Sequence, residues 1–130
     1  MKPTLKEHDL LLMIRTDSLQ RGDLCVFYNE NRLLLKRVIG LPGDSIDMDA
    51  EGNVTVNGSA LDEPYVESLY RGECDITFPY VVPEETYFVL GDNREVSVDS
   101  RKNQPGSISR EKTEGKVVLR IWPLKDLQVF

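Results

Sequence analysis

A chain of 130 residues can form one domain and bury roughly two thirds of the surface that its unfolded form exposes. Its formal net charge of -6 argues against a nucleic-acid-binding protein, because contact with phosphate backbones requires a basic face. No run of apolar residues approaches the roughly 20 that a transmembrane helix needs, and no secretory signal sequence is visible. Because of the negative net charge, nucleic acid is not expected as a partner.

Strand patterns dominate the first half of the chain. Apolar runs of strand length, separated by polar breaks, predict three strands, at Leu10–Ile14, Leu24–Tyr28 and Leu33–Ile39. Residues 29–32 predict a hairpin turn between the second and the third. In the turn that follows, Pro42 sets the backbone at the first corner and Gly43 accepts a positive φ at the second.

The second half contains further strands and two irregular stretches. Alternating or apolar runs predict strands at 46–48, 53–56, 86–90 and 116–122. Residues 59–80 are expected to make a short surface excursion, and residues 91–115 are rich in turns, with one helical turn near Arg110. Leu127–Phe130 is either an edge strand or disordered. The predicted fold class is all-β, with residues 1–130 forming a single domain of short, mostly antiparallel, twisted strands.

The histidine and cysteine content argues against a metal site. His8 is the only histidine and is interpreted as a turn residue, and Cys25 and Cys74 do not form a CxxC pair. Cys25 lies in an apolar run and is expected to pack as a small buried residue, whereas Cys74 lies in a polar stretch. A disulfide between them is disfavoured but left open. We expect neither a metal nor another cofactor.

Lys36 interrupts an apolar stretch. Alternation along a strand places it on the same face as Leu34 and Val38. A lysine with apolar neighbours either extends its amine to water or is held away from water. In the second case its pKa falls, and a neutral amine can act as a general base.

Four blocks of sequence carry chemistry by their order and spacing: Met1–Leu5, Arg21–Phe27, Leu35–Asp44 and Leu90–Arg101. Together they resemble bacterial type I signal peptidases. That family has Ser-Met-x-Pro-Thr-Leu, then Arg-Gly-Asp before an apolar strand, then Lys-Arg-x-x-Gly-x-Pro-Gly-Asp, and finally Gly-Asp-Asn-x-x-x-Ser-x-Asp-Ser-Arg. The resemblance extends from Met1 to Pro123, and its third and fourth blocks are highly specific.

The resemblance implies a Ser/Lys endopeptidase that removes signal peptides from exported preproteins. Lys36 matches the general base, and Ser97 matches the serine whose hydroxyl holds the amine of that base. The positions that match supporting charged residues are Asp92, Asp99 and Arg101. The positions that match the lining of shallow apolar pockets are Met1, Leu5, Leu34 and Leu35. The family binds its substrate as an extended strand and prefers Ala-x-Ala before the cleaved bond.

This sequence departs from the family at the nucleophile. The family's serine would stand immediately before Met1, so the chain by itself is expected to be inactive, and Thr4 does not replace it. Truncation is favoured over a natural pseudoenzyme because Lys36, Ser97 and Asp99 all remain. Two smaller departures are His8 in place of a glycine, and a longer loop at 102–106 that lacks an aromatic residue.

Three functions are considered. The first is a membrane-anchored peptidase on the extracytoplasmic side of the cell membrane, attached through a segment missing from this chain. The second is a non-catalytic signal-peptidase-like protein that assists the assembly of surface polymers such as pili. The residue before Met1 in the gene separates these two. A self-cleaving repressor domain is disfavoured, since no DNA-binding helices are predicted.

Overall fold

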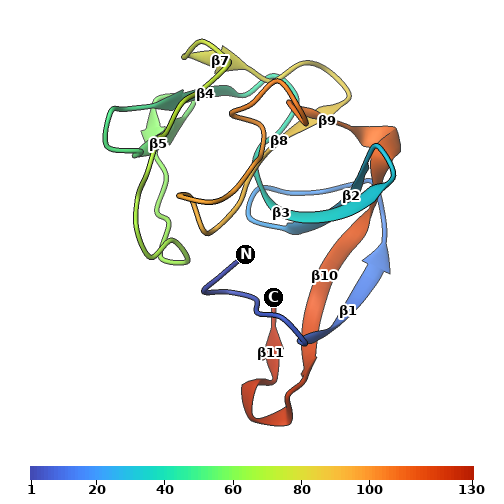
Figure 1. The fold of residues 1–130 in the computed structure, drawn as a ribbon. Helices are drawn as coiled ribbons and strands as arrows, with labels where there is room; N and C mark the ends of the chain where they lie inside the picture. The colour runs from blue at the N-terminus through green and yellow to red at the C-terminus, as the bar shows by residue number, and fades with distance from the viewer.

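The computed structural model describes residues 1–130 and confirms the predicted all-β fold (Figure 1). The strands are β1 (Leu10–Arg15), β2 (Leu24–Asn29), β3 (Arg32–Gly40), β4 (Ser45–Met48), β5 (Val54–Val56), β6 (Ser59–Ala60), β7 (Tyr80–Val81), β8 (Thr86–Leu90), β9 (Ile108–Ser109), β10 (Thr113–Trp122) and β11 (Gln128–Val129). The helical elements are two single 3-10 turns, η1 (Arg110–Lys112) and η2 (Leu124–Asp126). The turn predicted near Arg110 is therefore confirmed.

The larger sheet has the strand order β1-β10-β2-β3-β8-β9, and its strands pair in antiparallel fashion. β10 is the long strand of Figure 1 and begins earlier than predicted, at Thr113. Gly115 permits this extension, because a side chain there would collide with the backbone carbonyl of Ile14 on β1. β11 pairs with β10 at Leu119 and Arg120, so the end of the chain is an edge strand.

The two faces of β3 pack against different hydrophobic clusters. One face joins the Phe27 cluster, which consists of Leu19, Cys25, Phe27, Val38, Tyr87, Val89 and Ile108, with Leu34 and Leu41 at its border. The other face joins the Leu24 cluster, which consists of Leu5, Leu24, Val26 and Val117, with Met1, Leu11, Leu35 and Phe130 at its border. Lys36 lies opposite Cys25 in the register, between Leu34 and Val38 on the Phe27 side.

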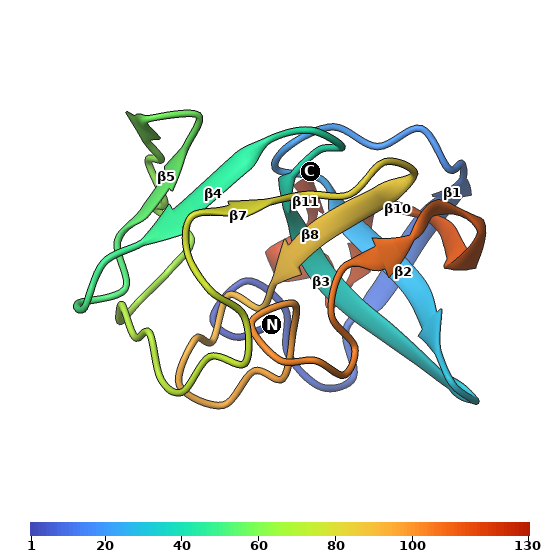
Figure 2. The same ribbon diagram turned by 90° about the horizontal axis from the view of Figure 1, so that it is seen from above.

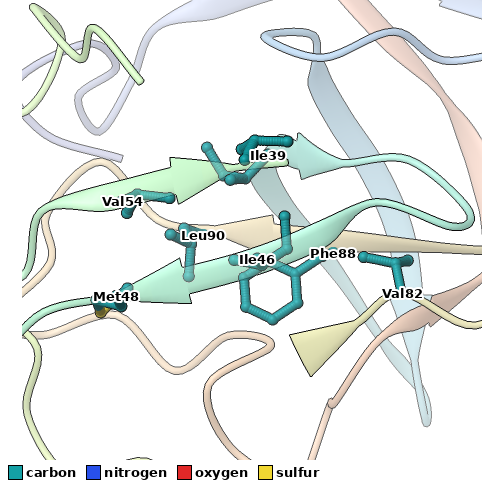
Figure 3. Packing of buried hydrophobic residues seen from close by; sticks show 8 residues of the cluster. Ile39, Ile46, Met48, Val54, Val82, Phe88 and Leu90 are labelled. Atoms are coloured by element: carbon teal, nitrogen blue, oxygen red, sulfur yellow. The ribbon is translucent and has the colours of Figure 1, made fainter. Parts of the chain in front are cut away.

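The smaller sheet has the order β6-β5-β4-β7 and lies beside the end of β3 and β8 (Figure 2). Alternating residues of β4 and β5 point inward and meet residues from β3 and β8 in a third cluster (Figure 3). Its buried members are Ile39, Ile46, Met48, Val54, Val56, Val82, Phe88 and Leu90. This cluster anchors the ends of β3 and β8, which are the two strands that carry the candidate site.

Two irregular segments lie around the chain's first residues. The loop from Gly91 to Arg101 follows β8, and both views place the N-terminus beside it (Figures 1 and 2). The backbone nitrogen of Asp92 lies 3.4 Å from the sulfur of Met1. Between β6 and β7, residues 61–79 contain no strand, in keeping with the predicted excursion. Cys25 is buried, and neither cysteine forms a disulfide.

Candidate active site

Lys36 is half-buried on β3, and its Nζ donates a hydrogen bond to Oγ of Ser97 over 2.9 Å. Burial lowers the pKa of the Lys36 amine. The carboxylate of Asp99 opposes this shift, and the guanidinium of Arg101 adds to it. The Lys36 amine is thus partly shielded from water and aligned by the Ser97 hydroxyl. The shielding favours its neutral form, which can accept a proton.

The loop Gly91–Arg101 brings Ser97 to this amine. Its first residue packs so closely that a Cβ on Gly91 would lie 2.5 Å from Cβ of Ser97 and 3.4 Å from Nζ of Lys36. Its far end is fixed to β8, because Ser100 Oγ accepts from the backbone N–H of Val89 over 2.9 Å. Glycine is thus required at position 91 by close approach to the Lys36–Ser97 pair.

Asp99 and Arg101 form a buried ion pair inside the same loop. The arginine donates from Nε to Oδ1 over 2.9 Å and from Nη2 to Oδ2 over 3.0 Å. Asp99 also accepts the backbone N–H of Gly91 over 3.0 Å, and Arg101 donates to the carbonyl of Ser97 over 3.3 Å. Asp99 therefore holds the backbone of Gly91, against which the Ser97 side chain packs, and Arg101 holds the backbone of Ser97 itself.

Asp92 pairs with an arginine outside its own loop. Arg37 donates to it from Nε over 2.9 Å and from Nη2 over 2.7 Å, and the pair is buried. The hydroxyl of Thr4 also donates to Asp92. The charged residues predicted as one supporting group thus form two pairs, Asp99–Arg101 inside the loop and Asp92–Arg37 toward the first residues of the chain.

Comparisons with known proteins assign the chain to a family. Residues 1–122 match the family model described as signal peptidase, peptidase S26. The chain belongs to this signal peptidase family. A probable signal peptidase I-2 of Synechocystis sp. is 38% identical over 95% of this chain and 60% of that protein, so the chain spans less than two thirds of that relative. Signal peptidase IB of Staphylococcus aureus strain N315 is 36% identical over 98% of this chain and 76% of that protein.

A solved structure supports the same assignment. The crystal structure of a signal peptidase I from Enterococcus faecalis V583 matches with a TM-score of 0.64 and 31% sequence identity. The match covers 76% of this chain and 96% of that one. The all-β arrangement described above is therefore the fold of a signal peptidase I.

The residues predicted to line the pockets are divided by β3. Met1, Leu5 and Leu35 belong to the Leu24 cluster, and Met1 also contacts Asp92. Leu34 borders the Phe27 cluster on the opposite face, the face that carries Lys36. Their role in a signal peptidase pocket stays a prediction.

A hollow of about 400 Å³ lies beside Ser97. Its walls come from the loop and from the segment between β6 and β7: Tyr70, Arg71, Gly72, Glu73, Arg94, Glu95, Val96, Ser97, Val98, Arg101 and Lys102. Val96 and Val98 are 72% and 56% exposed on either side of Ser97. Ser97, whose hydroxyl accepts from Lys36, thus lines an open depression together with the exposed Val96 and Val98.

Sequence reasoning missed three charged residues of this region. Arg37 and Arg94 stand inside the matched blocks, and their buried positions are visible only in the structure. Glu63 lies in the irregular excursion, where nothing in the sequence marks it, yet its carboxylate pairs with Arg94. Only a search for acidic residues that could neutralise the arginines of the Leu90–Arg101 block could have found Glu63.

No three His, Cys, Asp or Glu side chains are grouped so as to hold a metal ion. None of the helices is long and apolar enough to span a membrane.

Proposed function

We propose that this chain is the catalytic domain of a type I signal peptidase, a serine endopeptidase that removes signal peptides from exported preproteins. The observation that carries the proposal is the half-buried Lys36 amine, with its lowered pKa, bonded to Ser97 Oγ over 2.9 Å. Membership of the signal peptidase family supports the substrate class.

The proposed nucleophile is a serine immediately before Met1. Burial, followed by the nearby positive charge of Lys36, lowers the pKa of the Met1 amino group. A residue bonded to that nitrogen would therefore lie close to the Lys36 amine. A serine at this point would have a base in reach, which its weakly nucleophilic hydroxyl requires. Without that serine, the chain from Met1 onward is expected to be inactive.

In the proposed reaction Lys36 is the general base and Ser97 is its positioning residue. The serine oxygen attacks the scissile carbonyl carbon while its proton passes to Nζ of Lys36. The C–N bond then breaks, the Lys36 ammonium gives its proton to the leaving amine, and an acyl-enzyme remains. Water attacks this ester, Lys36 takes the water's proton, and the serine oxygen leaves with that proton as the signal peptide carboxylate is released. Asp99 and Arg101 hold the Ser97 loop throughout.

The proposed substrate is an extended peptide with small residues, of the Ala-x-Ala type, before the cleaved bond. Met1, Leu5 and Leu35 gather on one side of β3, and Leu34 lies on the other. We assign these four residues to the pockets that receive the small side chains. An extended peptide would bind through backbone hydrogen bonds beside the site.

The proposed location is the extracytoplasmic side of the cell membrane, with attachment through a segment before Met1. Large apolar side chains are exposed around the paired ends of β1, β10 and β11, including Leu10, Trp122 and Leu124 at 56%, 55% and 69%. Leu10 and Trp122 are partners in the β1–β10 register, and exposed apolar patches are typical of surfaces that contact other proteins or membranes. They are consistent with a domain that works next to a bilayer.

The test uses the chain extended by a serine and its native upstream residues. This protein should cleave a peptide with Ala at the first and third positions before the bond, and Lys36→Ala should abolish the cleavage, because the base is removed. Lys125→Ala removes an exposed lysine far along the chain and should leave the rate unchanged. Product formation is followed by chromatography and mass spectrometry.

Two results would reject the protease. One is an extended wild-type protein that stays inert, and the other is a Lys36→Ala protein that keeps its activity. A gene that encodes a residue other than serine before Met1 would instead favour the non-catalytic protein that assists surface-polymer assembly.

A further inference from the structure

The segment between β6 and β7 contacts the Ser97 loop through buried charge. The carboxylate of Glu63 receives Nη2 and Nη1 of Arg94, the latter over 3.3 Å. The side chains of Arg94 and Glu63 are 0% and 5% exposed. Arg94 also donates from Nε to the carbonyl of Gly91 over 2.8 Å. Glu63 thus reaches, through one side chain, the glycine against which Ser97 packs.

The same carboxylate is connected to the first residues of the chain. The hydroxyl of Tyr65 donates to Glu63 over 3.2 Å, and the ring of Tyr65 lies 3.9 Å from the guanidinium carbon of Arg37. Arg37 holds Asp92, which accepts the hydroxyl of Thr4. Burial and the nearby Glu63 raise the pKa of Tyr65, which keeps its hydroxyl protonated as a donor.

This arrangement is poorly explained by stability alone. Two arginines and two carboxylates are withdrawn from water, and the desolvation of buried ion pairs commonly offsets their attraction. What such pairs do provide is a fixed geometry, because bidentate contacts allow few orientations. Every buried side-chain nitrogen and oxygen has a partner, so the set is complete as it stands.

We propose that Glu63 is a positioning residue, which holds the Ser97 loop through Arg94 and the Met1–Thr4 segment through Tyr65 and Arg37. It fixes the two sides of the site relative to each other. As a role in catalysis this rests on the proposed function, since the Met1–Thr4 segment would carry the serine. The role of Glu63 in placing Ser97 against Lys36 does not depend on the proposed function.

The first readout needs no catalysis and uses the chain of 130 residues. The pKa of Lys36 is measured by NMR on lysine-labelled protein, where the other charges facing Lys36 are Asp99, Arg101 and the Met1 amine. In Glu63→Gln, Arg94 in the loop loses its carboxylate partner. Water then reaches Lys36, and the pKa of Lys36 should rise toward that of an exposed lysine. Glu67→Gln, an exposed change in the same segment, should leave it in place.

The second readout separates positioning from simple charge balance. Glu63→Leu combined with Arg94→Leu removes both charges and should restore the unfolding temperature that Glu63→Gln lowers. The double variant also lacks the Arg94 bond to Gly91, so the Lys36 pKa should remain raised. In the serine-extended protein, kcat should fall roughly 10- to 100-fold with KM little changed, as expected for misplaced groups. The acidic limb of the pH profile should move to higher pH.

A double variant that folds well and keeps both the native Lys36 pKa and the native kcat would overturn the proposal. A Glu63→Gln protein with an unchanged Lys36 pKa would also overturn it. If Glu63→Gln does not fold, the double variant decides. If the wild-type extended protein does not cleave peptides, the proposed function fails, and the pKa measurement still decides the role of Glu63.

Discussion

The Gly91–Arg101 loop and the 61–79 segment both lack strands, but they are organised in opposite ways. The loop supplies its own partners: Asp99 binds Gly91 and Arg101, and Arg101 binds the carbonyls of Arg94 and Ser97. In the segment, only one backbone hydrogen bond joins two of its own residues, from Val66 to Glu63 over 3.1 Å. The loop is built around its own charged side chains, whereas the side-chain bonds inside the segment are few, from Tyr65 to Glu63 and from Cys74 to the carbonyl of Arg71.

The segment takes its order from the loop and the neighbouring strand. Arg101 donates to the carbonyls of Tyr70 and Arg71 over 3.0 and 3.1 Å, and Arg94 binds Glu63. Arg71 in turn donates to the carbonyl of Met48 on β4 over 2.7 Å. The comparison therefore predicts a direction: damage to the loop should spread to the segment, whereas damage to the segment should stay local unless it breaks the Glu63–Arg94 pair.

Asp99→Asn should have the largest effect on stability. It leaves the buried Arg101 without its charge partner, and loss of one member of a buried pair destabilises by about 3–5 kcal/mol. Urea unfolding measures this loss. Amide hydrogen exchange should become faster at 91–101 and also at 70–75, because Arg101 no longer holds those carbonyls.

The matched control is Asp62→Asn, an exposed change in the segment, which should alter stability by less than about 0.5 kcal/mol. Faster exchange in Asp99→Asn confined to the loop would show that the segment orders itself, and the comparison would then be wrong.

A pair of glycine substitutions probes packing in the two regions. Gly91→Ala should destabilise by about 1–3 kcal/mol through overpacking, and it should abolish cleavage by the serine-extended protein, because its Cβ displaces Ser97 from Lys36. Gly72→Ala, with φ +65, places its Cβ 2.9 Å from the exposed Tyr70 ring, which can move aside, so its cost is mainly the backbone's, about 1–2 kcal/mol. Equal activity in the two variants would contradict this account of the loop.

Sequence reasoning succeeded where the information is local. Strands such as β8 follow apolar runs, and the turn at Gly43 follows from its need for a positive φ, observed at 86°. Asp99 and Arg101 are only two residues apart, so the motif places both in one loop, where they pair. Lys36 was marked by apolar neighbours on its own face, which left open whether its amine reaches water, and the structure shows the residue half-buried.

The failures concern contacts between distant residues. Asp92 pairs with Arg37 across 55 positions, and Arg94 pairs with Glu63 across 31. A charged residue has many opposite charges to choose from, and the choice depends on which elements the topology brings together. The irregular sequence of residues 59–80 predicted a surface excursion, but not that the Glu63 side chain is buried against Arg94, because that arginine belongs to another segment. Leu34 and Leu35 point to opposite sides of β3, which alternation requires and motif matching ignores.

The smallest effect reports how far the loop keeps water from Lys36. Burial lowers the pKa of folded Lys36 below that of the unfolded chain, so the unfolded state binds more protons between the two values. Wild-type stability should therefore rise with pH through that window relative to Lys36→Met, which cannot be protonated. Urea unfolding at pH 7 and near pH 10 should show that the free energy of unfolding of Lys36→Met, relative to that of wild type, is higher at pH 7 than near pH 10. Lys112→Met, an exposed change, should show no such trend. A constant difference between Lys36→Met and wild type would mean that the amine is hydrated in the folded state. The loop would then orient Lys36 without desolvating it, and the base would have to be activated by contact with the substrate.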